Sequence, residues 1–490
     1  MGFLITLLYF LFFVSITYWI NKKYISNIPT YTLPILFTLK TGYAAFFLYI
    51  YTFHYGGGEL TMDAGMFFKE SQILYHVFNQ SPTDYFQFLF GLNDDPAFID
   101  KYLEATSHWN SGLRFLLNDS RNVIRANSLI LFLSGGYVFV HFIIFSFFSF
   151  LGGFDLFQWL KKKTQIPHVF LLIILTLAPS VAFWSSSIIK EPLMILGLCL
   201  LLRGLFDNLS IQSKSWRILL GILLMIGFKT YVGIFILPVI IYLGWSYFFK
   251  KQWLAFSLFL AIGIFGIVAI KLSNKVAYII SNQQEDFYNV TNGGLYLEGD
   301  KEHYYYIEYR NRDHFNFSNE YATLTDTVTA FKMKRNENYK RFPFQLDSIG
   351  NAYKVHLNWD MAGSRVYITP IEDNYWKMWM IAPEALFNAF CQPIPNKSST
   401  WLQYPALLEN IIYIISLILA FFFFPKQLED KDKRIISSLW VYVLLIGLII
   451  GWTTPVSGAI VRYFIPAQVA LLVIFILKFD YIKFKKRFFT

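Results

Sequence analysis

The sequence predicts an all-α integral membrane protein with about eleven transmembrane helices and two outward-facing loop regions. Of its 490 residues, 55% are hydrophobic and 20% are aromatic, whereas only 15% are charged. Soluble domains carry about 25% charged residues. The mean hydropathy is +0.43, and long apolar runs recur along the chain, most of them near the about 20 residues that cross a bilayer. This composition excludes an ordinary water-soluble globule.

The apolar runs define the transmembrane spans. The first is followed by Lys22 and Lys23 and lacks a small-residue cleavage pattern, so we expect a retained helix and not a signal peptide. The run 218–228 is short, which indicates either a broken helix or a helix that begins earlier, around Leu209. The predicted spans are 3–20, 31–52, 127–151, 168–187, 192–206, 218–228, 231–249, 253–272, 407–425, 435–452 and 459–477.

Short loops rich in Lys and Arg mark the cytoplasmic side of a membrane protein. If Lys22 and Lys23 are cytoplasmic, the basic clusters at 161–163, 214–217, 250–251, 426–434 and 483–487 all fall on the same side. The N-terminus is then outside and the C-terminus is cytoplasmic. The net charge of +10 therefore indicates contact with membrane lipids and no nucleic-acid partner.

This topology divides the chain into five regions. We find no internal repeat, so one integral domain with outer elaborations is the simplest interpretation. The two outer segments carry most of the polar chemistry. The regions are 1–52, the first two transmembrane helices; 53–126, a first outer loop with amphipathic helices; 127–272, central transmembrane helices; 273–406, a large outer loop region; and 407–490, C-terminal transmembrane helices and a basic cytoplasmic tail.

Two carboxylates open the first outer loop. No GxGxxG, Walker, HExxH, CxxC or GxSxG motif occurs in a credible context, so polar residues at the outer face are the remaining candidates. If the segment is helical, Glu59 and Asp63 share one face at i, i+4 spacing. A carboxylate beside apolar surface can act as a general base. The alternative is a helix cap or a solvated loop acid.

Three isolated cations lie at the outward ends of apolar spans, where positive charge is otherwise scarce. They are Lys190, Lys229 and Arg462. A cation at a helix end needs an anion, and a lipid phosphate or pyrophosphate is the natural one, which an arginine holds bidentately. For each cation alone, snorkelling to the lipid headgroups is at least as good an explanation.

Other polar residues are candidates of lower specificity. Lys40 and His141 lie within predicted spans, where ionisable residues are functional hypotheses by default, although His141 fits a hydrogen-bonded core histidine. The outer histidines show no ligand spacing, so no metal site is predicted. In the large outer loop, Arg310, Arg312, Arg365 and Asp360 either contact an anionic or sugar substrate or are ordinary surface charges.

The pattern resembles the C-type glycosyltransferases (GT-C), polytopic membrane enzymes that use a polyprenyl-phosphate-linked sugar at the outer face. The resemblance rests on Met62-Asp63-Ala64 near the start of the early outer loop, on Pro179 to Ser186 leading to Lys190-Glu191, and on Gly458 to Tyr463 opening the final helix. It is spread over most of the chain and its specificity is modest. It places the chain among bacterial envelope-polysaccharide proteins, and hence in a bacterial inner membrane.

The resemblance implies a role for each candidate residue. Asp63, helped by Glu59, would be the general base for an acceptor hydroxyl on a glycan, lipid or protein. Lys190, Lys229 and Arg462 would stabilise the departing lipid phosphate of a polyprenyl-phosphate donor. Some members of the class need a divalent cation, but nothing in this sequence demands one. The implied site residues are Asp63, Glu59, Lys190, Lys229, Arg462, Tyr463, Arg310 and Arg365.

Two departures from the GT-C pattern leave alternatives open. The acidic loop follows the second helix and not the first, and Glu59 and Asp63 are four residues apart where an adjacent pair is usual. One alternative is an O-antigen-type polymerase or oligosaccharide ligase that acts on a lipid-pyrophosphate glycan through outer-loop arginines. Another is a transporter, flippase or non-catalytic scaffold.

Overall fold

The computed structural model divides the chain into two compact units. Unit 1 comprises Met1–Phe256, Ile412–Val443 and Ile465–Thr490, and unit 2 comprises Ser257–Ile411 and Leu444–Phe464. We describe each unit by itself. The residues that the structure describes are 2–25, 27–110, 118–291, 295–299, 302–318, 320–334, 342–357, 362–394, 401–425 and 428–488.

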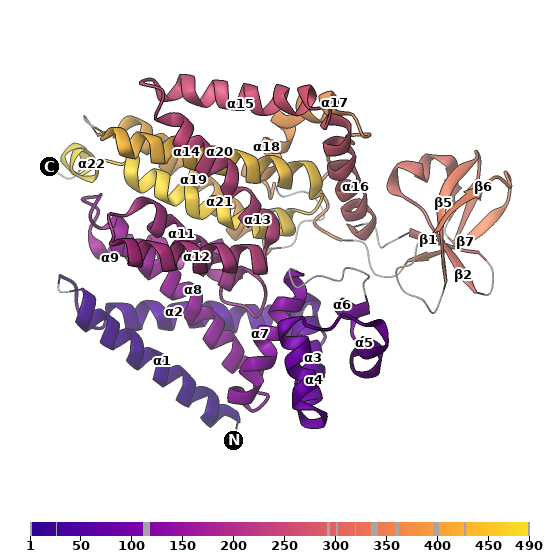
Figure 1. Cartoon of the computed structure of the whole chain (residues 1–490), viewed down its shortest axis with the longest axis horizontal. Helices are drawn as coiled ribbons and strands as arrows, with labels where there is room; N and C mark the ends of the chain where they lie inside the picture. Colours follow the sequence, from indigo (N-terminus) through magenta and orange to yellow (C-terminus); the bar gives the residue numbers. More distant parts are fainter. Residues whose placement is uncertain are drawn as a thin grey trace. The chain divides into compact units, whose positions relative to one another are not determined.

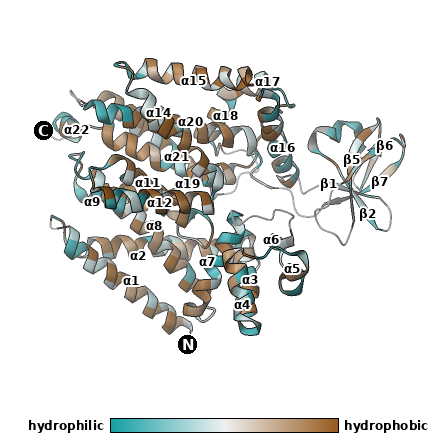
Figure 2. Ribbon diagram, in the orientation of Figure 1, coloured by the Kyte–Doolittle hydropathy of each residue, from teal (hydrophilic) through white to brown (hydrophobic). Residues whose placement is uncertain are grey.

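Long apolar helices dominate the described chain, so the protein is a helical integral membrane protein, as predicted. Figure 2 shows hydrophobic residues gathered in the long helices, whereas the strands are mostly pale or teal. Shorter apolar helices lie at His168–Leu177 and Thr230–Ser246. The eight helices within the described residues that are long and apolar enough to span a membrane are α1 (Gly2–Tyr24), α2 (Thr32–Tyr49, extended to His54 by a π-helix), α8 (Val138–Leu160), α12 (Ile211–Phe228), α15 (Gln252–Ala269), α19 (Gln403–Phe422), α20 (Asp430–Thr453) and α21 (Ser457–Lys478).

Several predicted spans are divided or shifted. The span 127–151 falls on two helices, because α7 (Asp119–Ser134) ends before Gly135-Gly136, both at positive φ, and α8 then begins. The weak span at 218–228 begins earlier, at Ile211, and a break at Lys229 separates it from α13 (Thr230–Ile234) and α14 (Ile236–Ser246). The predicted number of eleven spans is therefore not reproduced among the described helices.

The membrane part of unit 1 packs around α8 and α11 (Glu191–Phe206) (Figure 1). Glycines let α11 and α12 approach closely: a Cβ on Gly197 would lie 2.9 Å from the carbonyl oxygen of Gly221, and the reciprocal distance is 2.8 Å. Small residues serve this purpose in membrane helix packing. Before α11, α9 (His168–Leu177) and α10 (Pro179–Trp184) lead into a non-helical segment at 185–190.

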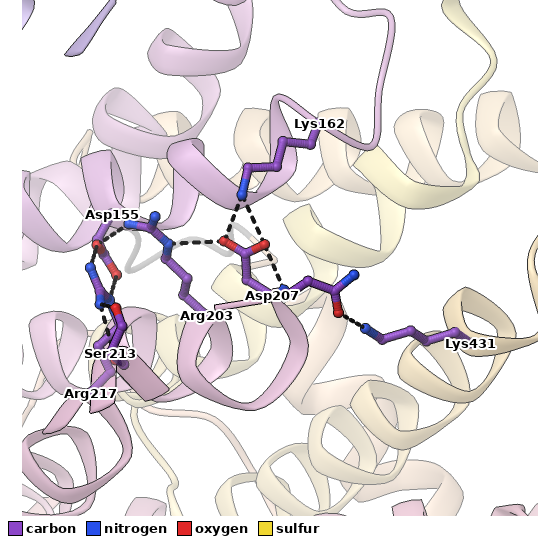
Figure 3. Close-up of polar contacts among 8 residues, drawn as sticks. Asp155, Lys162, Arg203, Asp207, Ser213, Arg217 and Lys431 are labelled. Atoms are coloured by element: carbon purple, nitrogen blue, oxygen red, sulfur yellow. Dashed lines mark hydrogen bonds and ion pairs between the residues drawn. The ribbon is translucent and has the colours of Figure 1, made fainter. Parts of the chain in front are cut away.

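A charge network binds α8, α11 and α12 on the predicted cytoplasmic side of unit 1 (Figure 3). Asp155 accepts hydrogen bonds from Arg203 and from Arg217, the latter from Nη2 at 3.1 Å. Asp207 lies 3.0 Å from Nζ of Lys162 and 3.3 Å from Nε of Arg203. Because each carboxylate joins two cations, the network stabilises the packing of these helices more specifically than isolated surface pairs would.

Short helices fill the segment of unit 1 that was predicted to be the first outer loop. The amphipathic stretch that begins at Met62 forms α3. Side chains cap the later helices: Ser81 accepts from the Asp84 backbone N–H, Asp95 from that of Ala97, and Asn118 from that of Arg121. The helices are α3 (Met62–Gln80), α4 (Pro82–Phe90), α5 (Pro96–Leu103) and α6 (Ser107–Asn110), followed by α7.

The segment of unit 2 predicted to be the large outer loop contains an antiparallel seven-stranded sheet, which the all-α prediction omitted. Its order is β3-β4-β7-β1-β2-β5-β6; Figure 1 labels β1, β2, β5, β6 and β7. Leu297, Ala322 and Ala330 pack in its apolar core. The strands are β1 (Leu295–Glu298), β2 (His303–Tyr306), β3 (Phe315–Phe317), β4 (Tyr321–Leu324), β5 (Val328–Lys334), β6 (Phe342–Leu346) and β7 (Ala352–Leu357); a 3₁₀ helix covers Tyr309–His314.

In the sequence of unit 2, helices precede and follow the sheet. The last described helix of the chain, α22 (Tyr481–Phe488), belongs to unit 1. The helices are α16 (Ser273–Thr291), α17 (Tyr375–Met380) and α18 (Ala382–Cys391). Ala277 of α16, Tyr375 and Met378 of α17 and Trp452 of α20 pack in one apolar cluster. The two cysteines, Cys199 and Cys391, are free.

Candidate functional site

Unit 1 gathers charged side chains near the starts of α7 and α11, the end of α12 and the third turn of α3. The Nδ2 atom of Asn122 on α7 donates a hydrogen bond of 2.8 Å to the carbonyl oxygen of Gly227, which ties α7 to the end of α12. We call this group the charged cluster. Its members are Glu70, Asp94, His108, Asp119, Arg121, Arg125, Lys190, Glu191 and Lys229.

Asp63 is presented by a strained start of α3. It is partly buried and lies in the first turn of the helix, directly after Met62, whose φ is +56°. A methionine rarely adopts this left-handed conformation, which costs about 1–3 kcal/mol unless the surroundings impose it. Gly65 is required here because a Cβ would lie 2.1 Å from the carbonyl oxygen of Leu60.

The loop before Asp63 is also fixed. The second helix ends in a π-helix at Ile50–His54, a feature that often occurs at functional sites. Gly57 and Gly58 then adopt positive φ, and the backbone N–H of Thr61 donates to the carbonyl oxygen of Tyr51 at 3.2 Å. The glycine-rich sequence thus builds a loop that holds Asp63 in one place.

Glu59 does not share a helix face with Asp63. It precedes α3, is 78% exposed, and forms a 2.9 Å ion pair with Lys69. The hydrogen bond and charge of Lys69 lower the pKa of Glu59. A fully solvated carboxylate with a lowered pKa is a weak base. The predicted i, i+4 arrangement is therefore wrong, because the helix begins three residues after Glu59.

Lys190 lies beside the helix that carries Asp63. Its Nζ is 2.9 Å from Oδ1 of Asp119 and 6.0 Å from the ring centroid of Phe67, which follows Asp63 by about one turn of α3. The side chains of Lys190 and Asp119 are 18% and 31% exposed. Lys190 is thus a partly accessible cation, and in this structure its anionic partner is the carboxylate of Asp119.

Lys229 is a buried partner of Glu191. Its Nζ lies 2.8 Å from Oε1 of Glu191, and the two side chains are 4% and 0% exposed. Lys229 sits at the break between α12 and α13, and Glu191 is the first residue of α11. The carboxylate supplies the anion that a cation at this depth requires, so the pair explains Lys229 without a lipid phosphate.

The sequence interpretation missed two buried arginines. Arg121 and Arg125 are 1% and 6% exposed, and their guanidinium carbons lie 5.4 and 5.8 Å from the ring centroid of Trp109. Burial lowers the pKa of Arg125 to about 10, and the like charge of Arg121 adds to the effect. Two neighbouring buried guanidinium groups favour binding of an anion. The sequence signal that could have revealed these two arginines is their i, i+4 spacing on an amphipathic segment.

Arg121 is bonded mainly to neutral acceptors. It donates from Nε to the carbonyl oxygen of His108 at 3.0 Å and from Nη2 to that of Trp109 at 3.1 Å. Its Nη1 lies 3.8 Å from Asp94, and within the described residues this buried atom has no hydrogen-bond partner. An unpaired buried donor is costly. The arrangement therefore favours an additional acceptor at Nη1.

Glu70 is a buried carboxylate on α3 that contacts the turn before Trp109. Its Oε1 accepts a hydrogen bond from the Ser107 backbone N–H and lies 2.9 Å from Nδ1 of His108. Within the described residues, its buried Oε2 has no hydrogen-bond partner. Glu70 thus orients the turn that leads to Trp109.

The two predicted intramembrane residues are hydrogen-bonded in the core of unit 1. Lys40 is 1% exposed and donates to Oγ of Ser185 at 2.8 Å, in the non-helical segment before α11. His141 lies 2.8 Å from Oγ of Ser134 and 2.9 Å from Oδ1 of Asn127. The interpretation of His141 as a core histidine is confirmed.

The other predicted site residues belong to unit 2. Arg462 and Tyr463 are partly buried on α21, and Arg365 is exposed and pairs through its backbone with Val456, just before that helix. Arg365 is therefore brought to the start of the helix that carries Arg462. Arg310 lies in the 3₁₀ helix, whereas Asp360 lies outside the described residues.

Over the described part of the chain, no group of three or more His, Cys, Asp or Glu side chains is arranged to hold a metal ion. Searches against protein-family models, curated proteins and solved structures find no match to this chain. The function is therefore argued from the geometry of the residues.

Proposed function

We propose that the protein is a membrane glycosyltransferase that moves a sugar from a polyprenyl-phosphate donor to an acceptor hydroxyl at the outer face of a bacterial inner membrane. The observation that carries the proposal is Asp63, a partly buried carboxylate held by a strained, glycine-dependent turn in the unit that contains the charged cluster. Backbone strain of this kind concentrates at functional sites.

The proposed reaction uses Asp63 as the general base. Its carboxylate takes the proton of the acceptor hydroxyl, the oxygen forms a bond with the anomeric carbon, and the bond from that carbon to the phosphate oxygen breaks. Polyprenyl phosphate leaves with the electron pair. Because negative charge grows on the phosphate in the transition state, cations placed in advance lower the barrier selectively.

Lys190 and Lys229, both predicted to bind the lipid phosphate, have different surroundings, and we propose different roles for them. Lys190 is partly accessible and its partner Asp119 is 31% exposed, so a lipid phosphate can replace this pair at modest cost. The Nη1 atom of Arg121 is a second donor that suits an anion. Lys229 is paired and buried, and we assign it a positioning role through Glu191, the neighbour of Lys190 in the sequence.

The proposal is tested with purified protein in nanodiscs, a radiolabelled polyprenyl-phosphate sugar and a pool of membrane acceptors. We expect Asp63→Asn to reduce transfer by at least about 100-fold, since general bases contribute about 10²–10⁴-fold. Glu59→Gln is the matched control and should retain nearly full activity. Correct folding is checked by an unchanged melting temperature.

Two outcomes contradict this assignment. Full transfer by Asp63→Asn removes the general base from the proposal. Loss of function confined to Arg310→Ala or Arg365→Ala favours a polymerase or ligase that acts through the outer-loop arginines.

A further inference from the structure

Unit 2 contains a cleft that shares no residue with the charged cluster of unit 1. Its volume is about 630 Å³, within the range of about 300–1,000 Å³ typical of small-molecule sites. It lies between the first turns of α16 and the segment that leads into α17. We call it the Glu372 cleft, and its main lining residues are Asn274, Tyr278, Glu372, Asp373, Asn374 and Trp376.

A rigid floor supports this cleft. Ala277, Ile371, Tyr375 and Met378 pack together in the apolar cluster of unit 2. The hydroxyl group of Tyr375 donates to the carbonyl oxygen of Ile264 at 2.8 Å. The residues that face the cleft therefore project from a packed surface, which keeps a binding site in one geometry.

The two carboxylates stand on a strained turn. Glu372 and Asp373 have φ values of +54° and +56°, and the backbone N–H of Asn374 donates to the carbonyl oxygen of Ile371 at 3.2 Å. Positive φ at both central positions is typical of type I′ turns, where Asn and Gly are the favoured residues. In this chain the two central positions of the turn are instead occupied by Glu372 and Asp373.

Both ends of the turn are fixed from outside. Before it, Gln284 of α16 accepts from the Ile371 backbone N–H at 3.1 Å and donates to the carbonyl oxygen of Thr369 at 3.1 Å. After it, the Asn374 side chain accepts from the backbone N–H groups of Trp376 and Lys377, both at 3.0 Å. These bonds fix the backbone on both sides of the turn that carries the two acids.

The lining favours a neutral, hydroxyl-rich ligand. Tyr278 and Trp376 are 54% and 49% exposed, and such rings pack against the apolar face of a sugar, whereas carboxylates and amides exchange hydrogen bonds with its hydroxyl groups. The carboxylates of Glu372 and Asp373 repel a phosphate. Glu372 is already paired with Lys377 at 2.6 Å, which reduces the attraction for an ammonium headgroup.

We propose that the Glu372 cleft binds a saccharide. Its further assignment as the site of a glycan acceptor rests on the proposed function, whereas binding of a saccharide follows from the lining alone. The cleft lies wholly within unit 2 and does not involve Asp63.

The test measures binding without turnover. The full chain in nanodiscs is titrated with maltose, cellobiose and N,N′-diacetylchitobiose and followed by saturation-transfer difference NMR. We expect millimolar or tighter binding of at least one disaccharide, a loss of about tenfold in affinity for Trp376→Ala, and a similar loss for Asp373→Asn. Tyr321→Ala, an exposed aromatic on the sheet, is the matched control and should bind normally.

A second variant separates a sugar from a lipid headgroup. Lys377→Gln removes the cation beside Glu372. A neutral saccharide should bind this variant with unchanged or weaker affinity, whereas phosphocholine or phosphoethanolamine should bind it more tightly. Headgroup binding that depends on Asp373, or the absence of any Trp376-dependent disaccharide signal, overturns the proposal. Asp63→Asn should keep full disaccharide binding. A failed transfer assay can therefore be distinguished from a cleft that does not bind saccharides.

Discussion

The Nζ atom of Lys229 lies 2.8 Å from Oε1 of Glu191, and both side chains are almost completely buried. The pair joins the break after α12 to the first residue of α11. Removing one partner would leave an uncompensated buried charge. We therefore expect Lys229→Met or Glu191→Met to lower the free energy of unfolding by about 3–5 kcal/mol.

The measurement for this pair is a double-variant cycle by thermal unfolding in detergent. The combination Lys229→Met with Glu191→Met should recover most of the loss, because a buried pair replaced by apolar groups is often neutral. Additive losses in the double variant would show that the two residues do not interact.

The stability that the charge network of Asp155 and Asp207 gives to unit 1 should depend on pH. Burial opposes ionisation of Asp207, but the hydrogen bonds and charges of Lys162 and Arg203 outweigh it, and the pKa of Asp207 is lowered. A lowered folded-state pKa gives stability that is present above the ordinary value of 3.8 and lost as the pH falls through the folded-state pKa.

We expect Asp207→Asn to cost about 1.5–3 kcal/mol at pH 7, with a smaller difference from the wild type below pH 3.8. Chemical unfolding at a series of pH values measures this. A difference that stays constant down to pH 2 would mean that folding does not lower the pKa of Asp207.

The strained turn of the Glu372 cleft gives a prediction with an internal control. Glu372→Gly and Glu372→Ala both remove the ion pair with Lys377, but only glycine relieves the positive φ. We expect the glycine variant to be more stable than the alanine variant by about 1 kcal/mol, measured by thermal unfolding. Equal stabilities would show that the turn is not strained.

Gly65 tests whether the turn at Asp63 matters for activity. A Cβ at this position would meet the carbonyl oxygen of Leu60 at 2.1 Å, so Gly65→Ala must displace the start of α3. We expect a loss of about 1–3 kcal/mol in stability and a large loss of transfer activity. Gly42→Ala is the control, since a Cβ there meets nothing within 4 Å. Normal activity of Gly65→Ala would separate the turn from the chemistry.

Hydropathy and local spacing predicted the elements that depend on short stretches of sequence. The long apolar helices and the break at Lys229 after α12 follow from the pattern of apolar runs. The partners of the cations do not, because Glu191 meets Lys229 and Asp119 meets Lys190 only after the helices pack. A single sequence gives no direct signal for such distant contacts.

The sheet of unit 2 was missed for a related reason. Its strands are three to seven residues long, and β1 lies between β7 and β2. Short strands with mixed Tyr and charged residues show weak alternation, and long-range pairing stabilises them. Likewise, Arg121 and Arg125 were inconspicuous on a polar segment until Trp109 and the α7 packing buried them.

The most direct test is a cryo-EM map of the full chain in nanodiscs with polyprenyl phosphate. The proposed function predicts density for the phosphate within hydrogen-bonding distance of Lys190, with the Asp63 carboxylate facing the same pocket, and loss of that density in Lys190→Ala. A phosphate bound away from Asp63, or density that Lys190→Ala leaves unchanged, would contradict it. The same map would report whether Arg462 contributes to the phosphate site.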